Sequence, residues 1–268
     1  MRRIRIAGLV LAAVFAVSAL AAASSTAAEP EYLSCGKASG KTGHYMNKAC
    51  SEVSAKSEGK YERTALTVPD KFKAKSGATG LFLYNPMTKE TLIEVPCAKD
   101  KDEGEIINTR EAKLKITYEG CVIPEGRALK GDCTSEGQKK AGTIVTDALV
   151  SRLVWTNEAE TEVGIELEPA TPGGPFTKFG CANMAEEVEV LGSEVGKITP
   201  VNEASKTLTT SFNVGSFGQP EFGGLYEGGT MTTVTELANL SGFVAHPDVP
   251  FSEKSVEPQK GGVALVTG

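Results

Sequence analysis

Histidine and tryptophan are nearly absent from this sequence, which has two histidines and one tryptophan in 268 residues. A serine hydrolase needs a histidine held beside its nucleophile and oriented by a carboxylate. His44 and His246 stand in polar stretches, "TGHYM" and "VAHPD", that predict loops, and the motif Gly-x-Ser-x-Gly does not occur. Trp155 stands in an apolar segment, where packing in a core or on a sheet face explains it. We therefore expect no enzymatic activity and no cofactor.

Basic runs and Cys-x-x-Cys pairs are also lacking. The chain has 28 lysines and arginines against 34 aspartates and glutamates, a net charge of −6. An acidic balance without a basic run argues against nucleic acid and membrane surfaces as partners. The cysteines lack the paired spacing typical of zinc sites, so zinc binding is only a minor alternative to disulfides.

The N-terminus has the order of a secretory signal peptide. Three arginines within the first five residues precede an uncharged apolar run over 6–23, which small residues follow. A retained membrane anchor is the alternative, although the run is rich in weakly apolar alanine. Cleavage before Glu29 would leave a mature chain without a membrane segment. Cys35 lies too far beyond the apolar run to be a lipid-bearing terminus.

The six cysteines predict three disulfides, because all of them fall in the exported part of the chain and their number is even. Proximity in sequence favours the pairs Cys35–Cys50 and Cys121–Cys133, which leaves Cys97–Cys181 as a long bridge. Fifteen pairings are possible, so this assignment is a hypothesis. Each bridge would stabilise the fold by about 3–5 kcal/mol if its effect is to restrict the unfolded chain.

Alternation of apolar and polar residues with a period of two is the main structural signal. In "AKLKITYEG" (112–120), Ala112, Leu114, Ile116 and Tyr118 share one face, and lysine, threonine and glutamate occupy the other. This is the pattern of a half-buried antiparallel strand. Similar segments predict strands at 80–84, 91–95, 142–146, 148–155, 161–169, 206–214, 230–237 and 261–266, and a hairpin around Gly192 within 186–198.

These strands are separated by turn-rich clusters at spacings typical of sandwiches and barrels. The best helix candidate, 46–57, is polar, and a turn held by a Cys35–Cys50 bridge explains it equally well. We therefore predict an all-β fold, an antiparallel β-sandwich or barrel stapled by disulfides. Residues 1–28 would be the signal peptide, 29–62 a disulfide-pinned N-terminal segment, and 63–268 the β domain.

An acidic stretch, "DKDEGEIINTRE" (100–111), resembles a calcium-binding loop in part. Asp100, Asp102, Asn108 and Glu111 occupy positions one, three, nine and twelve. Positions five and six, which need an oxygen donor and a glycine, are filled by glycine and glutamate instead. We therefore predict an acidic β-turn here, with a weak calcium site as the minor hypothesis.

The segment most suggestive of binding is "GSFGQPEFGGLYEGG" (215–229), where Phe217, Phe222 and Tyr226 are interleaved with six glycines. Such a loop can present aromatic rings to a partner. It can also fold back so that the rings close one end of the sheet structure, which is the interpretation we favour. Exposure of the three rings would distinguish these two interpretations.

Four stretches taken in order carry a resemblance to one family: 118–149, 163–169, 176–202 and 217–224. They contain a Gly-Cys, a Cys-Thr-Ser, a Gly-x-Ile-x-Thr strand, a Phe-x-Cys and a Gly-Ser-x-x-Gly-x-Ile-x-Pro-x-Asn element. Over most of the mature chain this pattern resembles a large set of paralogous secreted proteins of soil actinobacteria. That family has no assigned activity, ligand or catalytic residue. The resemblance implies secretion, β structure and use of the cysteines, and it transfers no site.

These features predict a secreted, monomeric, non-enzymatic β protein that is extracellular or held in the cell envelope. We expect it to bind an extracellular ligand or to associate with an envelope component, and we expect no deep pocket lined by ionisable side chains. The alternative is a secreted hydrolase of carbohydrate or ester substrates whose carboxylates or serine come together only in the fold. A third possibility is a structural envelope protein that self-associates.

Overall fold

The computed structural model describes residues 29–85, 90–124, 131–182 and 187–212, together with six strands between 225 and 266. Within these ranges every regular element is a β-strand, and the strands pair antiparallel. The predicted all-β, disulfide-stapled antiparallel class is confirmed. The predicted signal peptide, 1–28, lies outside the described residues.

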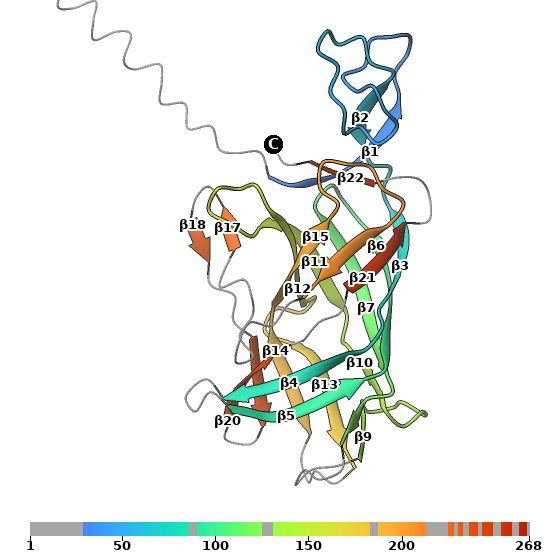
Figure 1. The fold of residues 1–268 in the computed structure, drawn as a ribbon. Helices are drawn as coiled ribbons and strands as arrows, with labels where there is room; N and C mark the ends of the chain where they lie inside the picture. Colours follow the sequence, from blue (N-terminus) through green and yellow to red (C-terminus); the bar gives the residue numbers. More distant parts are fainter. Residues whose placement is uncertain are drawn as a thin grey trace, which may run out of the picture.

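The strands form three sheets (Figure 1). A small sheet has the order β2-β1-β22, an eight-stranded sheet has the order β5-β4-β20-β19-β14-β13-β9-β8, and the largest runs β10-β7-β6-β3-β21-β16-β15-β12-β11-β17-β18. The small sheet consists of β1 (Glu31–Lys37), β2 (Tyr61–Ala65) and β22 (Val263–Val266). The eight-stranded sheet consists of β4 (Thr79–Asn85), β5 (Glu90–Cys97), β8 (Val122–Ile123), β9 (Gly131–Thr134), β13 (Pro175–Cys181), β14 (Val188–Gly192), β19 (Glu236–Leu240) and β20 (Phe243–Asp248). The largest sheet consists of β3 (Asp70–Lys75), β6 (Lys99–Ile106), β7 (Glu111–Glu119), β10 (Thr143–Val145), β11 (Leu149–Trp155), β12 (Val163–Pro169), β15 (Glu194–Thr199), β16 (Leu208–Ser211), β17 (Leu225–Glu227), β18 (Thr230–Thr232) and β21 (Glu253–Pro258).

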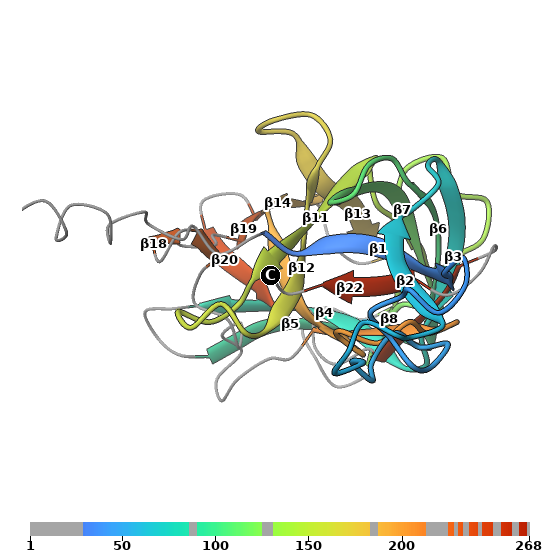
Figure 2. The same ribbon diagram turned by 90° about the horizontal axis from the view of Figure 1, so that it is seen from above.

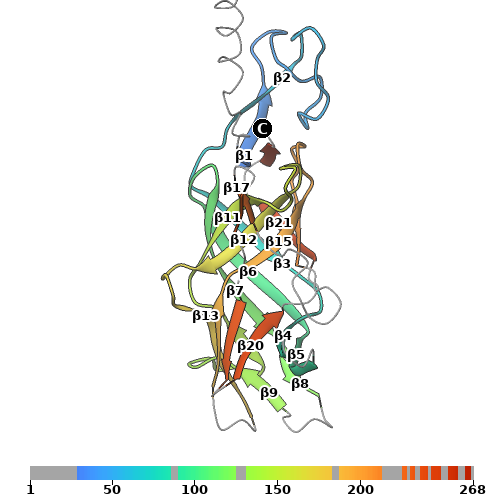
Figure 3. The same ribbon diagram turned by 90° about the vertical axis from the view of Figure 1, so that its left-hand side faces the viewer.

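The largest sheet closes on itself, because β7 pairs with β6 along its length and with β11 near its start. The closed ring runs β7-β6-β3-β21-β16-β15-β12-β11. The eight-stranded sheet lies at one end of this barrel, and the small sheet lies at the other end (Figures 1 and 3). Seen from above, β1 and β22 cross over the end of the barrel (Figure 2).

Strand β7 has the two faces that its sequence predicts. Ala112, Ile116 and Tyr118 are at most 1% exposed. Leu114, on the same face, is half-buried and packs against hydrophobic core residues. Lys113 and Lys115 are exposed on the other face. The strand ends at Gly120, whose φ of +69° suits glycine and turns the chain towards Cys121.

Two hydrophobic cores result from this arrangement. We call the first the disulfide core, because it contains Cys97, Cys121, Cys133 and Cys181. In this core, residues of the eight-stranded sheet pack against residues of the largest sheet. The former are Leu81, Val95, Phe176, Phe179, Val188 and Val190, and the latter are Ile116, Tyr118, Ile144 and Leu149. The second, the barrel core, contains no cysteine and is made of Tyr32, Leu66, Phe72, Ile106, Ala112, Leu153, Trp155, Val163, Ile198 and Leu208.

All six cysteines form disulfides, but two of the three predicted pairs are wrong. Cys35–Cys50 is present, whereas the other bridges are Cys97–Cys121 and Cys133–Cys181. Cys121 and Cys133 are neighbours through their backbones, because the Cys133 amide donates to the Cys121 carbonyl at 3.0 Å. Their sulfurs nevertheless bond to cysteines of other strands. Cys133 lies directly opposite Cys181 in the β9–β13 pair, so strand register decides the pairing and proximity in sequence does not.

The predicted hairpin in 186–198 is also wrong, although both strands exist. Strand β14 pairs with β13 and β19, while β15 pairs with β12 and β16. The chain therefore leaves the eight-stranded sheet after Gly192 and enters the barrel at Glu194. The φ of +97° at Gly192 permits this sharp change of direction.

The N-terminal segment projects beyond the barrel (Figure 1). Its helix candidate, 46–57, forms turns and single bridges instead, with Cys50 bonded to Cys35. Strand β2 crosses the boundary predicted after residue 62. The Arg63 guanidinium fastens the segment to the body of the protein, since it donates to the Cys50 carbonyl at 3.0 Å and to the Asn202 carbonyl at 2.8 Å. It also lies 4.7 Å from the centre of the Tyr45 ring.

Candidate functional site

The outer face of β3, β6 and β7 collects lysines. Alternation along each strand points every second side chain outward. On β3 and β6 the inward positions are buried or half-buried, and most of the outward ones are exposed. The outward positions are Thr117, seven lysines and four glutamates; the charged ones are Lys71, Lys73, Lys75, Lys99, Lys101, Lys113, Lys115, Glu103, Glu105, Glu111 and Glu119. An excess of lysine thus covers this face of a chain whose net charge is −6. We call it the lysine face.

Most of these lysines stand opposite a glutamate. The register places Lys71, Glu105 and Lys113 in one row across the three strands, and it places Lys73 and Glu103 in the next. The Lys73 ammonium donates to Glu103 at 2.9 Å, and this hydrogen bond lowers the pKa of the Glu103 carboxyl. Opposite charges on facing strands favour the pairing of those strands.

One row breaks this pattern. Lys75 stands directly opposite Lys101 in the β3–β6 pair, and its neighbour on the other side, in β21, is Ser255. Like charges that face each other across a strand pair destabilise it. Among the ion pairs of the described residues, Lys101 takes part in one with Glu119, and none includes Lys75.

Glu119 is the centre of the charges at the end of β7. Its carboxylate lies 2.7 Å from the Lys101 ammonium, 3.2 Å from that of Lys99 and 3.6 Å from that of Lys140. Hydrogen bonding to Lys101 and then to Lys99 lowers the pKa of Glu119 from its ordinary value of 4.5 to about 2. One carboxylate thus holds three ammonium groups near the junction of β6 and β7.

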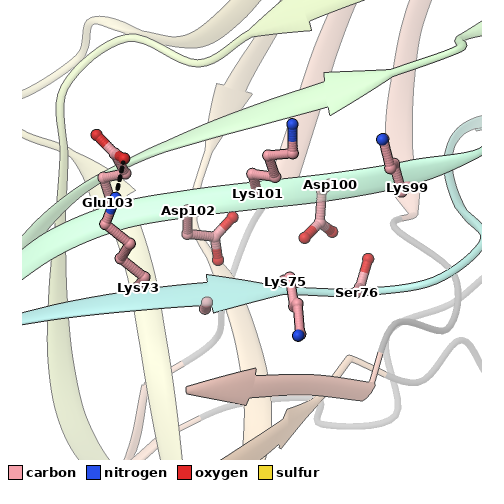
Figure 4. A pocket seen from close by; sticks show the side chains of 9 residues that line it. Lys73, Lys75, Ser76, Lys99, Asp100, Lys101, Asp102 and Glu103 are labelled. Carbon is pink, nitrogen blue, oxygen red and sulfur yellow. Dashed lines mark hydrogen bonds and ion pairs between the residues drawn. The ribbon is translucent and has the colours of Figure 1, made fainter. Parts of the chain in front are cut away.

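A pocket of about 480 Å³ lies over the paired ends of β3 and β6 (Figure 4). Figure 4 shows the side chains of Lys75 and Lys101 extending away from one another on either side of it. We expected no deep pocket lined by ionisable side chains, and a pocket with such a lining is present here. It is lined by Lys73, Ala74, Lys75, Ser76, Lys99, Asp100, Lys101, Asp102 and Glu103.

The two aspartates of the pocket are buried. Asp100 is 0% exposed and Asp102 is 3% exposed, because both occupy inward positions of β6. Their register neighbours on β7 are Tyr118 and Ile116, which belong to the disulfide core. The aspartates therefore lie on the opposite face of β6 from its lysines.

This placement overturns the predicted acidic turn at 100–111. Residues Lys99–Ile106 form strand β6, and only the four residues that follow form the turn. Within that turn the Asn108 side-chain oxygen accepts the amides of Arg110 and Glu111, each at 2.8 Å. Asp100 lies six residues before the end of the strand, about 20 Å from the turn that contains Asn108, so these two residues cannot bind one calcium ion.

A second charged cluster lies further around the barrel, on the outer face of β11 and β12. The Arg152 guanidinium donates to Glu166 at 3.0 Å, and the Ser193 hydroxyl donates to the other oxygen of Glu166 at 3.2 Å. Partial burial, followed by the neighbouring Glu166 charge, raises the pKa of Glu168. Glu111 adds to this effect, while Arg152 opposes it. The cluster is a partly compensated ion-pair network.

The sequence-predicted binding residues are only partly described. Phe217 and Phe222 lie outside the described residues. Tyr226 is placed on β17, where it pairs in register with Trp155 of β11. Trp155 is 2% exposed and belongs to the barrel core, which confirms its predicted packing role. The binding role of the aromatic loop stays a prediction.

The two histidines are far apart in the fold. His44 lies in the predicted loop, exposed, with its Nδ1 at 2.6 Å from Glu62. Burial of Glu62 raises the pKa of its carboxyl, but the hydrogen bonds from His44 outweigh this effect, so the pKa is lowered overall. His246 was also predicted in a loop, and this is wrong, since it lies on β20 opposite Tyr84 of β4.

In the described ranges, no group of three or more histidine, cysteine, aspartate or glutamate side chains is arranged to hold a metal ion. Within the same ranges no helix has the length and apolar character that a membrane span requires.

Comparisons with protein families, characterised proteins and solved structures found no match to this chain.

Proposed function

We propose that this protein is a secreted, non-enzymatic binding protein whose lysine face recognises an anionic extracellular polysaccharide. The observation that carries the proposal is the excess of outward lysines on β3, β6 and β7 in an otherwise acidic chain. Clusters of one charge raise the local concentration of oppositely charged ligands and steer their association. The three disulfides and the signal-like N-terminus support an extracellular location, where such disulfides persist.

The chemistry of the face favours a charged glycan over nucleic acid. Proteins that bind single-stranded nucleic acid combine basic grooves with aromatic rings on which bases stack. The outward positions of β3, β6 and β7 are lysine, glutamate and threonine, without an aromatic residue. Recognition here would depend on charge and on the spacing of about 6.7 Å between alternate residues of a strand.

The alternative, a secreted hydrolase, has one structural feature in its favour. Asp100 and Asp102 are two residues apart on one strand, which separates them by about 7 Å, a distance compatible with a pair of glycosidase carboxylates. Their burial weighs against this role, because a substrate must touch both carboxyl groups. A binding function therefore fits the pocket better than hydrolysis does.

The proposal is tested by measuring binding of the full mature chain to immobilised dextran sulfate, with unsubstituted dextran as the neutral control. We expect binding to dextran sulfate only, and we expect it to weaken as salt is raised because added ions screen surface charges. Replacing Lys71, Lys113 and Lys115 with glutamine should weaken binding about tenfold or more, at up to about 1 kcal/mol for each exposed charge.

A matched control removes three lysines from the N-terminal segment instead, Lys41, Lys48 and Lys56, all exposed. This variant has the same net charge as the first and should bind dextran sulfate as the wild type does. Equal losses in the two variants would show that net charge alone matters and would overturn the lysine face as the site. Binding of single-stranded DNA as tight as that of dextran sulfate would overturn the polysaccharide.

A further inference from the structure

The end of the N-terminal segment differs in charge from the rest of the chain. Residues 36–60, which we call the N-terminal tip, contain five lysines and two glutamates, whereas the whole chain has a net charge of −6. The acidic balance of the whole chain argued against a membrane surface as a partner, but it conceals this basic region. All of the lysines are exposed, and they are Lys37, Lys41, Lys48, Lys56 and Lys60.

The lysines of the tip differ from many lysines of the barrel in their partners. Among the ion pairs of the described residues, none includes a lysine of the tip. On the lysine face, by contrast, Lys73, Lys99 and Lys101 each lie within 3.2 Å of a glutamate oxygen. The ammonium groups of the tip can therefore contact an external anionic surface without breaking an ion pair inside the protein.

The tip also exposes two large apolar side chains. Val53 is 70% exposed and Met46 is 45% exposed, more than any other large hydrophobic side chain that the structure describes. The two residues flank a turn in which the Asn47 side-chain oxygen accepts two backbone amides. Lys48 lies within the same turn and is exposed. Apolar and basic side chains therefore meet at one place on the tip.

The backbone of the tip is closely packed and fastened to the rest of the protein. Gly43 and Gly59 donate to one another through both amides, at 2.9 and 2.7 Å, and a Cβ at either position would lie 2.3 Å from a backbone oxygen. The Cys35–Cys50 bridge and the Arg63 guanidinium then connect the tip to β1 and to the body. The tip projects from the end of the barrel, whereas the lysine face follows the side of the barrel (Figures 1 and 3).

We infer that the N-terminal tip docks onto the surface of a bilayer that contains anionic lipid. Its lysines contact the lipid phosphates, and Met46 and Val53 enter the boundary between the headgroups and the acyl chains. The positive charge selects an anionic partner. The exposed apolar pair favours a lipid surface over a soluble polyanion, because only the bilayer offers hydrocarbon to these side chains. This docking is separate from binding by the lysine face, so one molecule can bind a lipid surface and a polysaccharide together.

The test measures co-sedimentation of the full mature chain with vesicles of phosphatidylglycerol and phosphatidylcholine, and vesicles of pure phosphatidylcholine are the neutral control. We expect binding only where phosphatidylglycerol is present, and we expect it to weaken as salt is raised. Replacing Lys41, Lys48 and Lys56 with glutamine should weaken vesicle binding by about tenfold or more, since each lysine near an anionic surface contributes about fivefold.

The apolar contact is tested by combining Met46→Gln with Val53→Thr, which leaves the charge unchanged. Vesicle binding should fall about tenfold, because both side chains lose their favourable transfer into the interface. The Tm of the free protein should not change, since both side chains are exposed. The control is Val122→Thr, which alters an exposed valine of β8 at the other end of the molecule and should bind vesicles as the wild type does (Figure 3).

The control for charge is the variant of the lysine face in which Lys71, Lys113 and Lys115 are glutamine, because it has the same net charge as the lysine variant of the tip. It should bind vesicles as the wild type does. Equal losses in the two lysine variants, or no binding of the wild type to anionic vesicles, would overturn docking by the tip. Full vesicle binding by the apolar variant would also overturn it, because charge alone would then explain the contact. Loss of dextran sulfate binding with vesicle binding intact would contradict only the proposed function.

Discussion

The disulfide core and the barrel core are stabilised in different ways. The barrel core is surrounded by a ring of strands that pair around its circumference, and its side chains include Phe72, Leu153 and Trp155. The disulfide core lies where the eight-stranded sheet meets the barrel, and that sheet ends in β8 and β9, which are two and four residues long. Strands this short make few hydrogen bonds, so the two buried disulfides supply connections that pairing does not.

Strand β7 connects the two cores, because its inward residues reach both. Ala112 belongs to the barrel core, whereas Ile116 and Tyr118 belong to the disulfide core. Beyond Glu119 the chain enters the Cys97–Cys121 bridge. If this comparison is right, removing a disulfide should mainly destabilise the disulfide core, and truncating a buried side chain should mainly destabilise the barrel core. Strand β7 should respond to both kinds of change.

The largest effect is expected from removing the Cys133–Cys181 bridge by replacing both cysteines with alanine. This bridge closes the longest loop, with a sequence separation of 48, and its loss should lower the free energy of unfolding by about 4 kcal/mol. Chemical denaturation under non-reducing conditions measures the change. Removing Cys35–Cys50, with a separation of 15, should cost about 3 kcal/mol and should leave amide exchange in β9 and β13 unchanged. Equal exchange patterns in the two variants would contradict the assignment of Cys133–Cys181 to the disulfide core.

A truncation in the barrel core comes next. Leu153 is 0% exposed there, so Leu153→Ala should lower the free energy of unfolding by about 3 kcal/mol through lost burial and the cavity that remains. The control is Val150→Ala, on the outer face of the same strand. It should lower the free energy of unfolding by less than about 1 kcal/mol. Reducing agent should not change the difference between these two variants. A difference that disappears on reduction would show that the barrel core depends on the bridges.

The contact between the N-terminal segment and the body should respond to Arg63. Its guanidinium donates to the carbonyls of Cys50 and Asn202, and a second contact joins the Ala204 amide to the Ala49 carbonyl at 2.7 Å. Arg63→Met keeps the approximate length of the side chain and removes the guanidinium donors, so we expect the free energy of unfolding to fall by about 2 kcal/mol. Limited proteolysis within 38–60 should become faster in this variant. Unchanged proteolysis would mean that the Cys35–Cys50 bridge alone holds the segment.

The sequence predicts β7 from its apolar inward residues and does not predict β6, whose inward residues include two aspartates. The segment 112–120 shows apolar residues at alternate positions, and it forms β7 as predicted. The segment 99–106 alternates in the same way, but Asp100 and Asp102 occupy its buried positions, and the acidic stretch 100–111 therefore predicts a turn. Burial of charge against a hydrophobic core runs contrary to the usual preference, so a pattern based on hydrophobicity cannot find such a strand.

The lysine face could have been found from a different pattern. Lysine recurs at every second position in 71–75, at 99 and 101, and at 113 and 115, which is the spacing of one strand face. The sequence does not reveal the order of β3, β6 and β7 in the sheet. It also does not reveal the register that places Lys75 opposite Lys101. The same lack of register explains the two wrong disulfide pairs, because Cys133 meets Cys181 through strand pairing.

The smallest effect is expected from Glu119, at the end of β7 beside the disulfide core. Its folded-state pKa of about 2 lies below the ordinary 4.5, so its ionised form stabilises the folded protein above about pH 4.5. This contribution should be lost as the pH falls from about 4.5 to about 2, where the carboxyl becomes protonated in the folded state too. Glu119→Gln removes the charge at every pH. The Tm of the wild type should therefore exceed that of the variant at neutral pH, and the two values should converge towards pH 2. Added salt should reduce the difference at neutral pH, because the three lysine contacts are near the surface. A difference that is constant from pH 7 to about pH 2 would show that Glu119 contributes through packing and not through its charge.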